Sequence, residues 1–442
     1  MKTFITIWFG QFVSQIGTAM TRFALLIWAY QQTGNATTVA LLGFFAFLPP
    51  ILVSPFAGVW IDRIDRRKIL LLTDLGAGLM TIGMLLLYRL GQLEIWHLYL
   101  AQALTGAFEA FQRPAFQAAS STLLPKEQYS RANGLRSLAE FSAQVLAPIL
   151  SGLVLFWVGI AGVMAIDTAT FFVALVTLLI VRLPAVTHES VASDAVKPAF
   201  REELRVGFRY IRERRGLLGL AALMTVIEFL AALTWFAVLP AMILARSGNN
   251  ELALSGVQGG MGIAGVLGGL LVSIWGGPKR KVRGFLFGIA FSFLLGDIPL
   301  AVGRSLPVWI MASAAGTFFI PILGSAHEAL WQSKVSPAVQ GRVFAARNMV
   351  TQSLVPLGYL LGGTLADHLL EPAMQVDGWL ASSFGWLVGT GPGTGMALMF
   401  VGSAICAIIL CVVGYRIPAI RNLEDDLPDH NYVASRTAIQ VA

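Results

Sequence analysis

Apolar runs of about 20 residues follow one another from the first residues almost to the end of this 442-residue chain. Each run is long enough to cross the ~30 Å hydrocarbon core of a bilayer as a helix. Only helices and closed barrels satisfy the backbone in lipid, and these runs lack the period-two alternation of a barrel strand. A mean hydropathy of +0.72 agrees with this reading. The sequence therefore predicts an all-α polytopic membrane protein.

Twelve membrane-spanning helices are predicted. The first begins within a few residues of Met1 and leads into further spans, which is not the pattern of a cleaved signal peptide. The predicted spans are 4–31, 38–61, 69–90, 96–122, 129–157, 160–181, 217–246, 252–276, 284–303, 306–333, 341–368 and 395–415.

Positive charge alternates between the connections. One set contains most of the Lys and Arg: 62–68, Lys126 with Arg131, 182–216, 277–283, and Lys334 with Arg342. The other set is nearly free of them: 32–37, 90–95, 158–160, 247–251 and 369–394. The positive-inside rule places the first set and both termini in the cytoplasm. The same rule accounts for the formal charge of +7, so we expect no nucleic-acid partner.

Cys406 and Cys411 both fall in the last apolar run, where they are typical of small core residues. Their spacing indicates neither a metal site nor a structural disulfide. We expect no metal and no cofactor, and a monomer in the lipid bilayer.

The basic segment 182–216 separates six spans from six. Phe200, Leu204, Phe208 and Ile211 form an apolar stripe, which predicts an amphipathic helix along the inner membrane surface. It either pins the two halves together or binds a lipid or partner. The predicted parts are a helical bundle at 1–181, a linker at 182–216, a second bundle at 217–416 and a flexible cytoplasmic tail at 417–442.

The two halves repeat each other. Pro125 leads to Arg131 and Arg136 after the fourth span, and Pro337 leads to Arg342 and Arg347 after the tenth. The turn from Gly58 to Lys68 corresponds in place to that from Gly269 to Arg280. Parallel six-helix repeats of this kind are typical of transporters whose substrate path lies between the halves.

The stretch "GVWIDRIDRRKIL" resembles a signature of the major facilitator superfamily, G-x-x-x-D-R-x-G-R-R. The matching residues are Gly58, Asp62, Arg63, Arg66 and Arg67, and Asp65 replaces the usual Gly. The segments "TGNA", "LPP", "DRRKILLLTDL", "ANGLRSLAE" and "LGGTLAD" resemble the macrolide-efflux and enterobactin-exporter branch of that superfamily. The resemblance implies two six-helix bundles that alternate access to a central site.

The resemblance also implies that Asp62 faces the start of the eleventh span, near Gly341, Arg342 and Arg347. A carboxylate is stabilised there by a helix N-terminus and a nearby Arg. Our hypothesis is that Asp62 and Arg66 form a gating latch that favours the outward-facing state. Asp74 is expected to brace this latch. Arg63 belongs to the same signature, and Arg67 is predicted to serve topology.

Ionisable residues at membrane depth are costly and usually functional. Arg22 requires a carboxylate partner or an anionic ligand. Glu109 and Glu228 are the preferred proton sites, although Arg113, four residues after Glu109, offers that carboxylate an alternative ion pair. The other candidates are Glu140, which could pair with Arg136, a structural Asp167, and, more weakly, Asp297 and Glu328.

The fifth span contains "AQVLAPILSG", which resembles the antiporter motif G-x-x-x-G-P-x-x-G-G with Ala and Ser in place of some glycines. Small residues allow close helix approach, and a proline allows a bend. The matching residues are Ala143, Ala147, Pro148, Ser151 and Gly152. Drug–proton antiporters of this superfamily carry an Arg in the fourth span, and the resemblance implies one near Gln102. That Arg is absent here, so any proton coupling would use other residues.

These features predict a secondary transporter of the bacterial inner membrane that exports an amphiphilic small molecule in exchange for protons. The exported compound would be a drug, a siderophore or a peptide or polyketide metabolite. No ATP-binding motif is present. An uptake carrier or uniporter of the same fold is the alternative. A membrane enzyme or a sensor is more remote, because the five histidines are scattered and no output domain follows.

Overall fold

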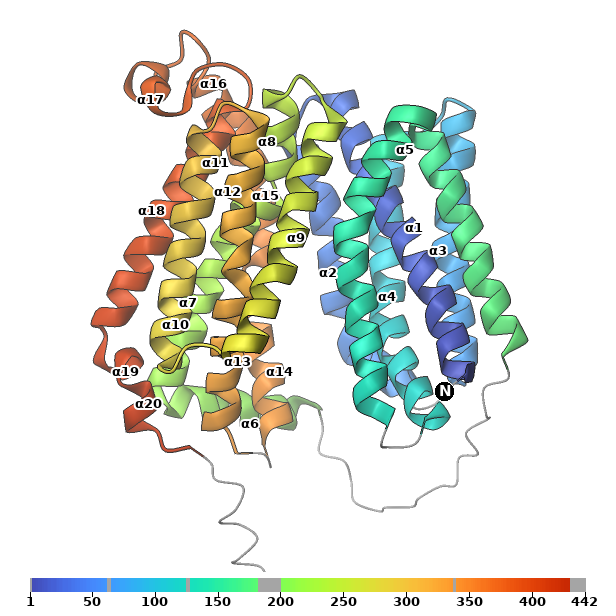
Figure 1. Cartoon of the computed structure of the whole chain (residues 1–442), viewed down its shortest axis with the longest axis horizontal. Helices are drawn as coiled ribbons and strands as arrows, with labels where there is room; N and C mark the ends of the chain where they lie inside the picture. Colours follow the sequence, from blue (N-terminus) through green and yellow to red (C-terminus); the bar gives the residue numbers. More distant parts are fainter. Residues whose placement is uncertain (1, 62–64, 125–127, 182–199, 337–338, 430–442) are drawn as a thin grey trace, which may run out of the picture. The chain divides into compact units, whose positions relative to one another are not determined.

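The computed structural model describes residues 2–61, 65–124, 128–181, 200–336 and 339–429. Regular secondary structure in these ranges is entirely helical (Figure 1). The first half of the chain forms α1 (Lys2–Thr33), α2 (Ala36–Ile61), α3 (Arg66–Arg89), α4 (Ile95–Leu123) and α5 (Tyr129–Ile180).

Helix α5 contains the fifth and sixth predicted spans in one element. The chain reverses between them at Gly159, whose φ of 71° lies in the left-handed region. Glycine adopts that conformation without the steric penalty of a Cβ atom.

The second half of the chain is more broken. Three five-residue π-helical segments, η2, η3 and η4, interrupt its helices within the described residues. The elements are α6 (Phe200–Glu213), α7 (Arg215–Ala231), η2 (Ala232–Phe236), α8 (Leu239–Arg246), α9 (Glu251–Trp275), α10 (Lys281–Ser292), η3 (Phe293–Asp297), α11 (Ile298–Val302), α12 (Leu306–Phe318), α13 (Ile320–Lys334), α14 (Gln340–Gln352), α15 (Val355–Leu365), η4 (Ala366–Leu370), α16 (Glu371–Ala373), α17 (Ala381–Val388), α18 (Thr394–Arg416), α19 (Pro418–Arg421) and α20 (Leu423–Asp426).

Nine helical stretches of the described residues are long and apolar enough to span a membrane. One of them, Ser142–Ile180, holds parts of two predicted spans. The predicted spans 96–122 and 341–368 are helical but are not among the nine. These stretches confirm an all-helical polytopic membrane protein, and the number twelve stays a prediction.

The chain divides into two compact units. Unit 1 comprises Met1–Val191, Leu233–Gly262 and Tyr359–Ala397, and unit 2 comprises Ala192–Ala232, Ile263–Gly358 and Leu398–Ala442. Segments of the second half therefore belong to unit 1, where α8 and η4 contact α2. The division at 181, 216 and 416 stays a prediction.

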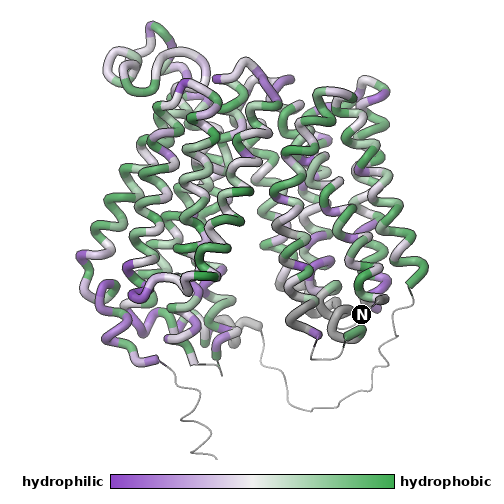
Figure 2. Tube along the Cα trace, in the orientation of Figure 1, coloured by the Kyte–Doolittle hydropathy of each residue, from purple (hydrophilic) through white to green (hydrophobic). Residues whose placement is uncertain are grey.

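Each unit has its own apolar core. Ala24, Leu98 and Met164 are buried in unit 1, and Phe285 and Trp331 are buried in unit 2. Large apolar side chains also remain on the surface, as expected of helices that face lipid. Figure 2 shows hydrophobic residues along most of the long helices and hydrophilic residues gathered toward many helix ends.

Helix α6 packs across the start of α14 in unit 2 (Figure 1). A Cβ atom on Gly207 would lie 2.3 Å from the carbonyl oxygen of Arg342, so only glycine allows this approach. Ile211 is buried, whereas Phe208 remains exposed. Part of the stripe predicted to face the membrane therefore covers protein.

Residues 417–429 of the predicted flexible tail contain two short helices and buried side chains, and the flexibility of the tail stays a prediction. Ile420 and Leu423 are each only 3% exposed in unit 2. The Glu424 carboxylate accepts the backbone N–H groups of Lys281 and Val282 at the start of α10, at 3.0 and 3.1 Å. Glu424 thus satisfies a helix N-terminus, whereas Asp425, Asp426 and Asp429 are exposed. Residues 430–442 lie outside the described ranges.

Candidate functional site

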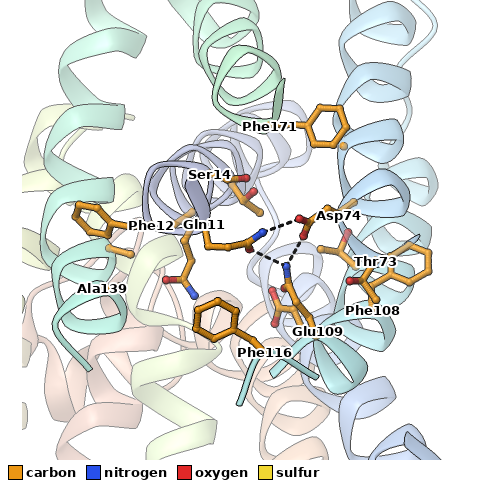
Figure 3. A pocket seen from close by; sticks show the side chains of 18 of the residues that line it. Gln11, Phe12, Ser14, Thr73, Asp74, Phe108, Glu109, Phe116, Ala139 and Phe171 are labelled. Atoms are coloured by element: carbon orange, nitrogen blue, oxygen red, sulfur yellow. Dashed lines mark hydrogen bonds between the residues drawn. The ribbon is translucent and has the colours of Figure 1, made fainter. Parts of the chain in front are cut away.

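A cavity of about 280 Å³ lies inside unit 1, among α1, α3, α4 and α5. Its wall combines aromatic side chains with acids, amides and arginines, and Figure 3 shows Phe108, Phe116 and Phe171 around the polar centre. An apolar wall with a few convergent polar groups is the usual composition of a small-molecule site.

Arg22 of α1 and Glu109 of α4 form an ion pair across this cavity. Their side chains are 34% and 35% exposed. Arg22 was predicted to require a carboxylate partner or an anionic ligand, and in this structure its partner is the carboxylate of Glu109. The alternative pair between Glu109 and Arg113 along α4 is not formed in the described structure.

Asp74 of α3 lies in the same cavity and is bound by two amides (Figure 3). Gln11 Nε2 of α1 donates to Asp74 Oδ2 at 2.6 Å, and Gln112 Nε2 of α4 donates to Oδ1 at 2.5 Å. Gln112 Nε2 also donates to Gln11 Oε1 at 3.2 Å. The sequence analysis singled out Asp74 but not its amide partners, which follow only from how the three helices meet.

Asp167 of α5 is buried and joins three helices. Its Oδ1 accepts the hydroxyl of Thr18 on α1 at 3.2 Å, and its Oδ2 accepts that of Thr81 on α3 at 3.0 Å. A Cβ atom on Gly17 would lie 3.0 Å from Asp167 Oδ1, so α1 and α5 are in close contact here. These contacts hold α1, α3 and α5 together, and the structural role of Asp167 stays a prediction.

Arg113 and Arg136 also line the cavity. Neither makes a hydrogen bond or ion pair to another described residue. The Arg136–Glu140 pair stays a prediction, because the side chain of Glu140 lies outside the described set.

The structure does not describe Asp62 and Arg63 of the charged turn. The side chain of Arg66 and the surroundings of Gly58 also lie outside the described set. The latch therefore stays a prediction. Asp65 does have a clear role, since its Oδ1 accepts the N–H of Arg67 at 2.9 Å and caps α3. This capping bond gives a physical reason for Asp where the signature has Gly.

Arg67 ties two helices of unit 1 together. Its Nη2 donates to the carbonyl oxygens of Leu178 and Leu179, at 3.3 and 3.0 Å, near the end of α5. Carbonyl groups in the last turn of a helix lack intrahelical partners. Arg67 therefore joins the start of α3 to the end of α5.

The second predicted arginine pair behaves differently in unit 2. Arg347 of α14 is buried, donates to Glu328 Oε1 of α13 at 2.7 Å, and also contacts the Asn348 amide oxygen. Arg342 is exposed. Glu328, a predicted proton or substrate group, is thus the ion-pair partner of Arg347.

Glu228 and Asp297 lie beside π-helical segments. Glu228 of α7 is half-buried, makes no side-chain bond to another described residue, and precedes η2 by one turn. Asp297 is the buried last residue of η3, followed by Pro299 in α11. π-Helical turns are frequent at functional sites.

The antiporter-like motif forms a tightly packed face of α5 in unit 1. Ala143, Ala147, Pro148 and Ser151 are buried, and Ser151 Oγ donates to the carbonyl oxygen of Met20 at 3.0 Å. A Cβ atom on Gly152 would lie 2.0 Å from Ser255 Oγ of α9. The small residues therefore bring α5 against both α1 and α9.

Sequence analysis did not identify Asp367 of η4 as a functional residue. Its carboxylate oxygens accept the N–H groups of Ala36 and Thr37, at 2.9 and 2.7 Å, at the start of α2. Gly363 lies one turn earlier, where a Cβ atom would be 2.5 Å from Thr37 Cα. The signal available in the sequence was the spacing of Gly363 and Asp367, a glycine and an acid four residues apart.

Comparisons with known proteins agree on the family. A family model described as Major Facilitator Superfamily matches residues 7–359. Macrolide efflux protein A of Streptococcus pyogenes is 26% identical over 373 residues, which is 83% of this chain and 90% of that protein. A candidate bacilysin exporter of Bacillus subtilis, BacE, is 26% identical over 359 residues, or 80% of this chain and 86% of that protein.

Solved structures show the same fold. A bacterial homologue of the lysosomal transporter Spinster, in an inward-facing and unoccupied conformation, has a TM-score of 0.65 at 17% identity, covering 96% of this chain and 98% of that one. The nucleoside transporter NupG has a TM-score of 0.64 at 12% identity, covering 93% and 99%. The matched family model spans most of the sequence, and the chain belongs to the Major Facilitator Superfamily of membrane transporters.

Proposed function

We propose that this protein is a proton-coupled exporter of amphiphilic small molecules in the bacterial inner membrane, with both termini in the cytoplasm. The observation that carries the proposal is the unit 1 cavity, where aromatic side chains surround three membrane-embedded carboxylates. Aromatic walls suit the apolar part of an amphiphile, and embedded acids suit proton exchange. The names of relatives as macrolide efflux proteins support export.

Transport occurs by alternating access, with a separate contact holding each side of the membrane. On the cytoplasmic side we assign the latch to Asp62 and Arg66, as the superfamily signature implies. On the other side, the bonds from Ala36 and Thr37 to Asp367 supply a matching contact. In both cases a carboxylate meets a helix N-terminus, which stabilises the charge.

Inside-out vesicles that contain the protein test the function directly. They are acidified inside by respiration and contain a pH-sensitive dye, and macrolides, siderophores and amphiphilic peptides are added in turn. A proton-coupled exporter releases protons from the vesicle when its substrate is added, and vesicles without the protein do not.

Two results would argue against the proposal. Accumulation of a compound without any change in the proton gradient would favour a uniporter. Loss of activity in Asp62→Asn is expected while expression persists, and full transport by that variant would refute the latch.

A further inference from the structure

The three carboxylates of the unit 1 cavity are held by different chemistry. Glu109 has a direct guanidinium partner in Arg22. Asp167 has two hydroxyl donors and lies close enough to Arg22 for electrostatic attraction. Among the described residues, only the two amides stabilise the charge of Asp74. Glu109 thus has a cationic partner, whereas Asp74 has none among the described residues.

We propose that Asp74 is the proton-binding group of transport, with Gln11 and Gln112 as positioning residues. This inference deepens the proposed function and rests on it. Asp74 is 6% exposed and lines the cavity, so substrate can reach its surroundings while bulk solvent is largely excluded. A buried carboxylate without a cation is costly to keep ionised, which makes its charge responsive to conformation.

The amide partners allow either protonation state. With Asp74 ionised, Gln11 Nε2 and Gln112 Nε2 donate to its two oxygens. With Asp74 neutral on Oδ2, the new O–H requires an acceptor. Inversion of the Gln11 amide turns Oε1 toward that hydrogen, while Gln112 continues to donate to Oδ1. The inversion places Gln11 Nε2 opposite Gln112 Nε2, so the 3.2 Å bond between the glutamines is lost and the two amides must move apart.

The proposed exchange moves one proton through Asp74. A proton from water on the acidic side binds Asp74 Oδ2, and the same proton leaves to water on the other side after the conformational change. The other charged groups around the cavity are Arg22 on α1, Glu109 and Arg113 on α4, and Arg136 and Asp167 on α5. A substrate carrying a cationic amine competes with the proton for Asp74, and this competition is the requirement of exchange.

Infrared spectroscopy of the full chain in liposomes, titrated from acid to alkaline pH, tests the assignment without a ligand. We expect a protonated-carboxyl band that is absent in Asp74→Asn and present in Glu109→Gln and Asp167→Asn. An unchanged band in Asp74→Asn, or loss of the band in Asp167→Asn alone, would overturn it.

Variants of the amides cover the case in which Asp74→Asn does not fold. Gln11→Leu with Gln112→Leu keeps the acid, and we expect it to displace the midpoint of the band. Gln15 lines the same cavity one turn from Gln11, so Gln15→Leu is the matched control and leaves the midpoint in place. Equal midpoints in both variants would contradict the role of the amides.

Transport separates this inference from the proposed function. Liposomes with an imposed pH gradient are given erythromycin, a cationic macrolide, as the probe. If wild type shows no gradient-driven movement, the proposed function fails for this probe, and the infrared result still decides the proton site. If wild type moves the probe and folded Asp74→Asn moves it equally, the assignment of Asp74 fails alone.

Discussion

Glu109 and Asp74 line the same cavity, but they meet their neighbours in different ways. Glu109 is paired with the guanidinium of Arg22, whereas Asp74 accepts two neutral amides. An ion pair fixes a charge in place, while amides can satisfy a carboxyl group whether or not it carries a proton. Depth in the membrane alone therefore does not identify a proton site. The identity of the hydrogen-bond donors matters more.

A cation placed beside Asp74 should give it the same kind of partner as Glu109 and cause the largest expected loss of transport. In Gln112→Lys an ammonium replaces an amide donor of similar length, and an adjacent cation favours the ionised form of Asp74. We expect loss of gradient-driven transport, measured in proteoliposomes with a compound that wild type exports. Gln92→Lys adds the same charge in the exposed turn after α3, outside the cavity, and should retain transport. Equal rates in the two variants would show that Asp74 need not change its charge.

Removal of one member of the Arg22–Glu109 pair should instead affect stability. Glu109→Gln leaves a partly buried guanidinium without its counter-charge, and the pair is only about one-third exposed. We expect a loss of about 1–2 kcal/mol, between the values for exposed and fully buried pairs. The measurement is thermal unfolding in detergent. The double variant Arg22→Met, Glu109→Met should recover part of the loss, and a double variant less stable than the single one would contradict this reading.

Asp367 represents a third way to hold a carboxylate, because its donors are backbone N–H groups of α2. Asp367→Ala removes a helix cap and should lower stability by about 1 kcal/mol in the same unfolding assay. The exposed Asp377 provides the control, since Asp377→Ala should change nothing measurable. Equal stability of the two variants would mean that water replaces the cap at no cost.

The Arg347–Glu328 pair of unit 2 should be less sensitive than its unit 1 counterpart. The Glu328 side chain is 46% exposed, but Arg347 is only 7% exposed and would stay buried in Glu328→Gln. Arg347 keeps the Asn348 oxygen and the faces of Trp331 and Phe344 as neighbours, so we expect a loss of only about 0.5 kcal/mol. A loss as large as that of Glu109→Gln would show that these neighbours do not compensate the guanidinium for the lost carboxylate.

Local pattern predicted the helices well and their partners poorly. Apolar runs place each predicted span on a helix because burial in lipid depends on each segment's own composition. The sequence alone could not show whether Glu109 pairs with Arg113, four residues further along α4, or with Arg22 on another helix. The amides around Asp74 were invisible for the same reason, because Gln11 and Gln112 are 101 positions apart. The contact of the tail with α10 could not be read from the sequence, because Glu424 caps a helix that begins more than 140 positions earlier.

The smallest expected effect concerns Asp429 of unit 2, an exposed acid that pairs with the buried cation of Lys334. A hydrogen bond from Lys334 lowers the pKa of Asp429, and their atoms are 2.9 Å apart. A lowered folded-state pKa gives stability that is complete above the unfolded value of about 3.9 and is lost as pH falls through the folded value.

Asp429→Asn should therefore be less stable than wild type by only a few tenths of a kcal/mol at neutral pH, because the Asp429 side chain is 56% exposed to screening solvent. Lys334 also keeps the carbonyl oxygen of Glu424 as an acceptor at 2.8 Å, so its charge is not left unpaired. The difference between variant and wild type should stay constant from neutral pH to about 4 and vanish below it. Thermal unfolding across that range measures it, and a difference that grew on acidification would mean that Lys334 is stabilised by another group.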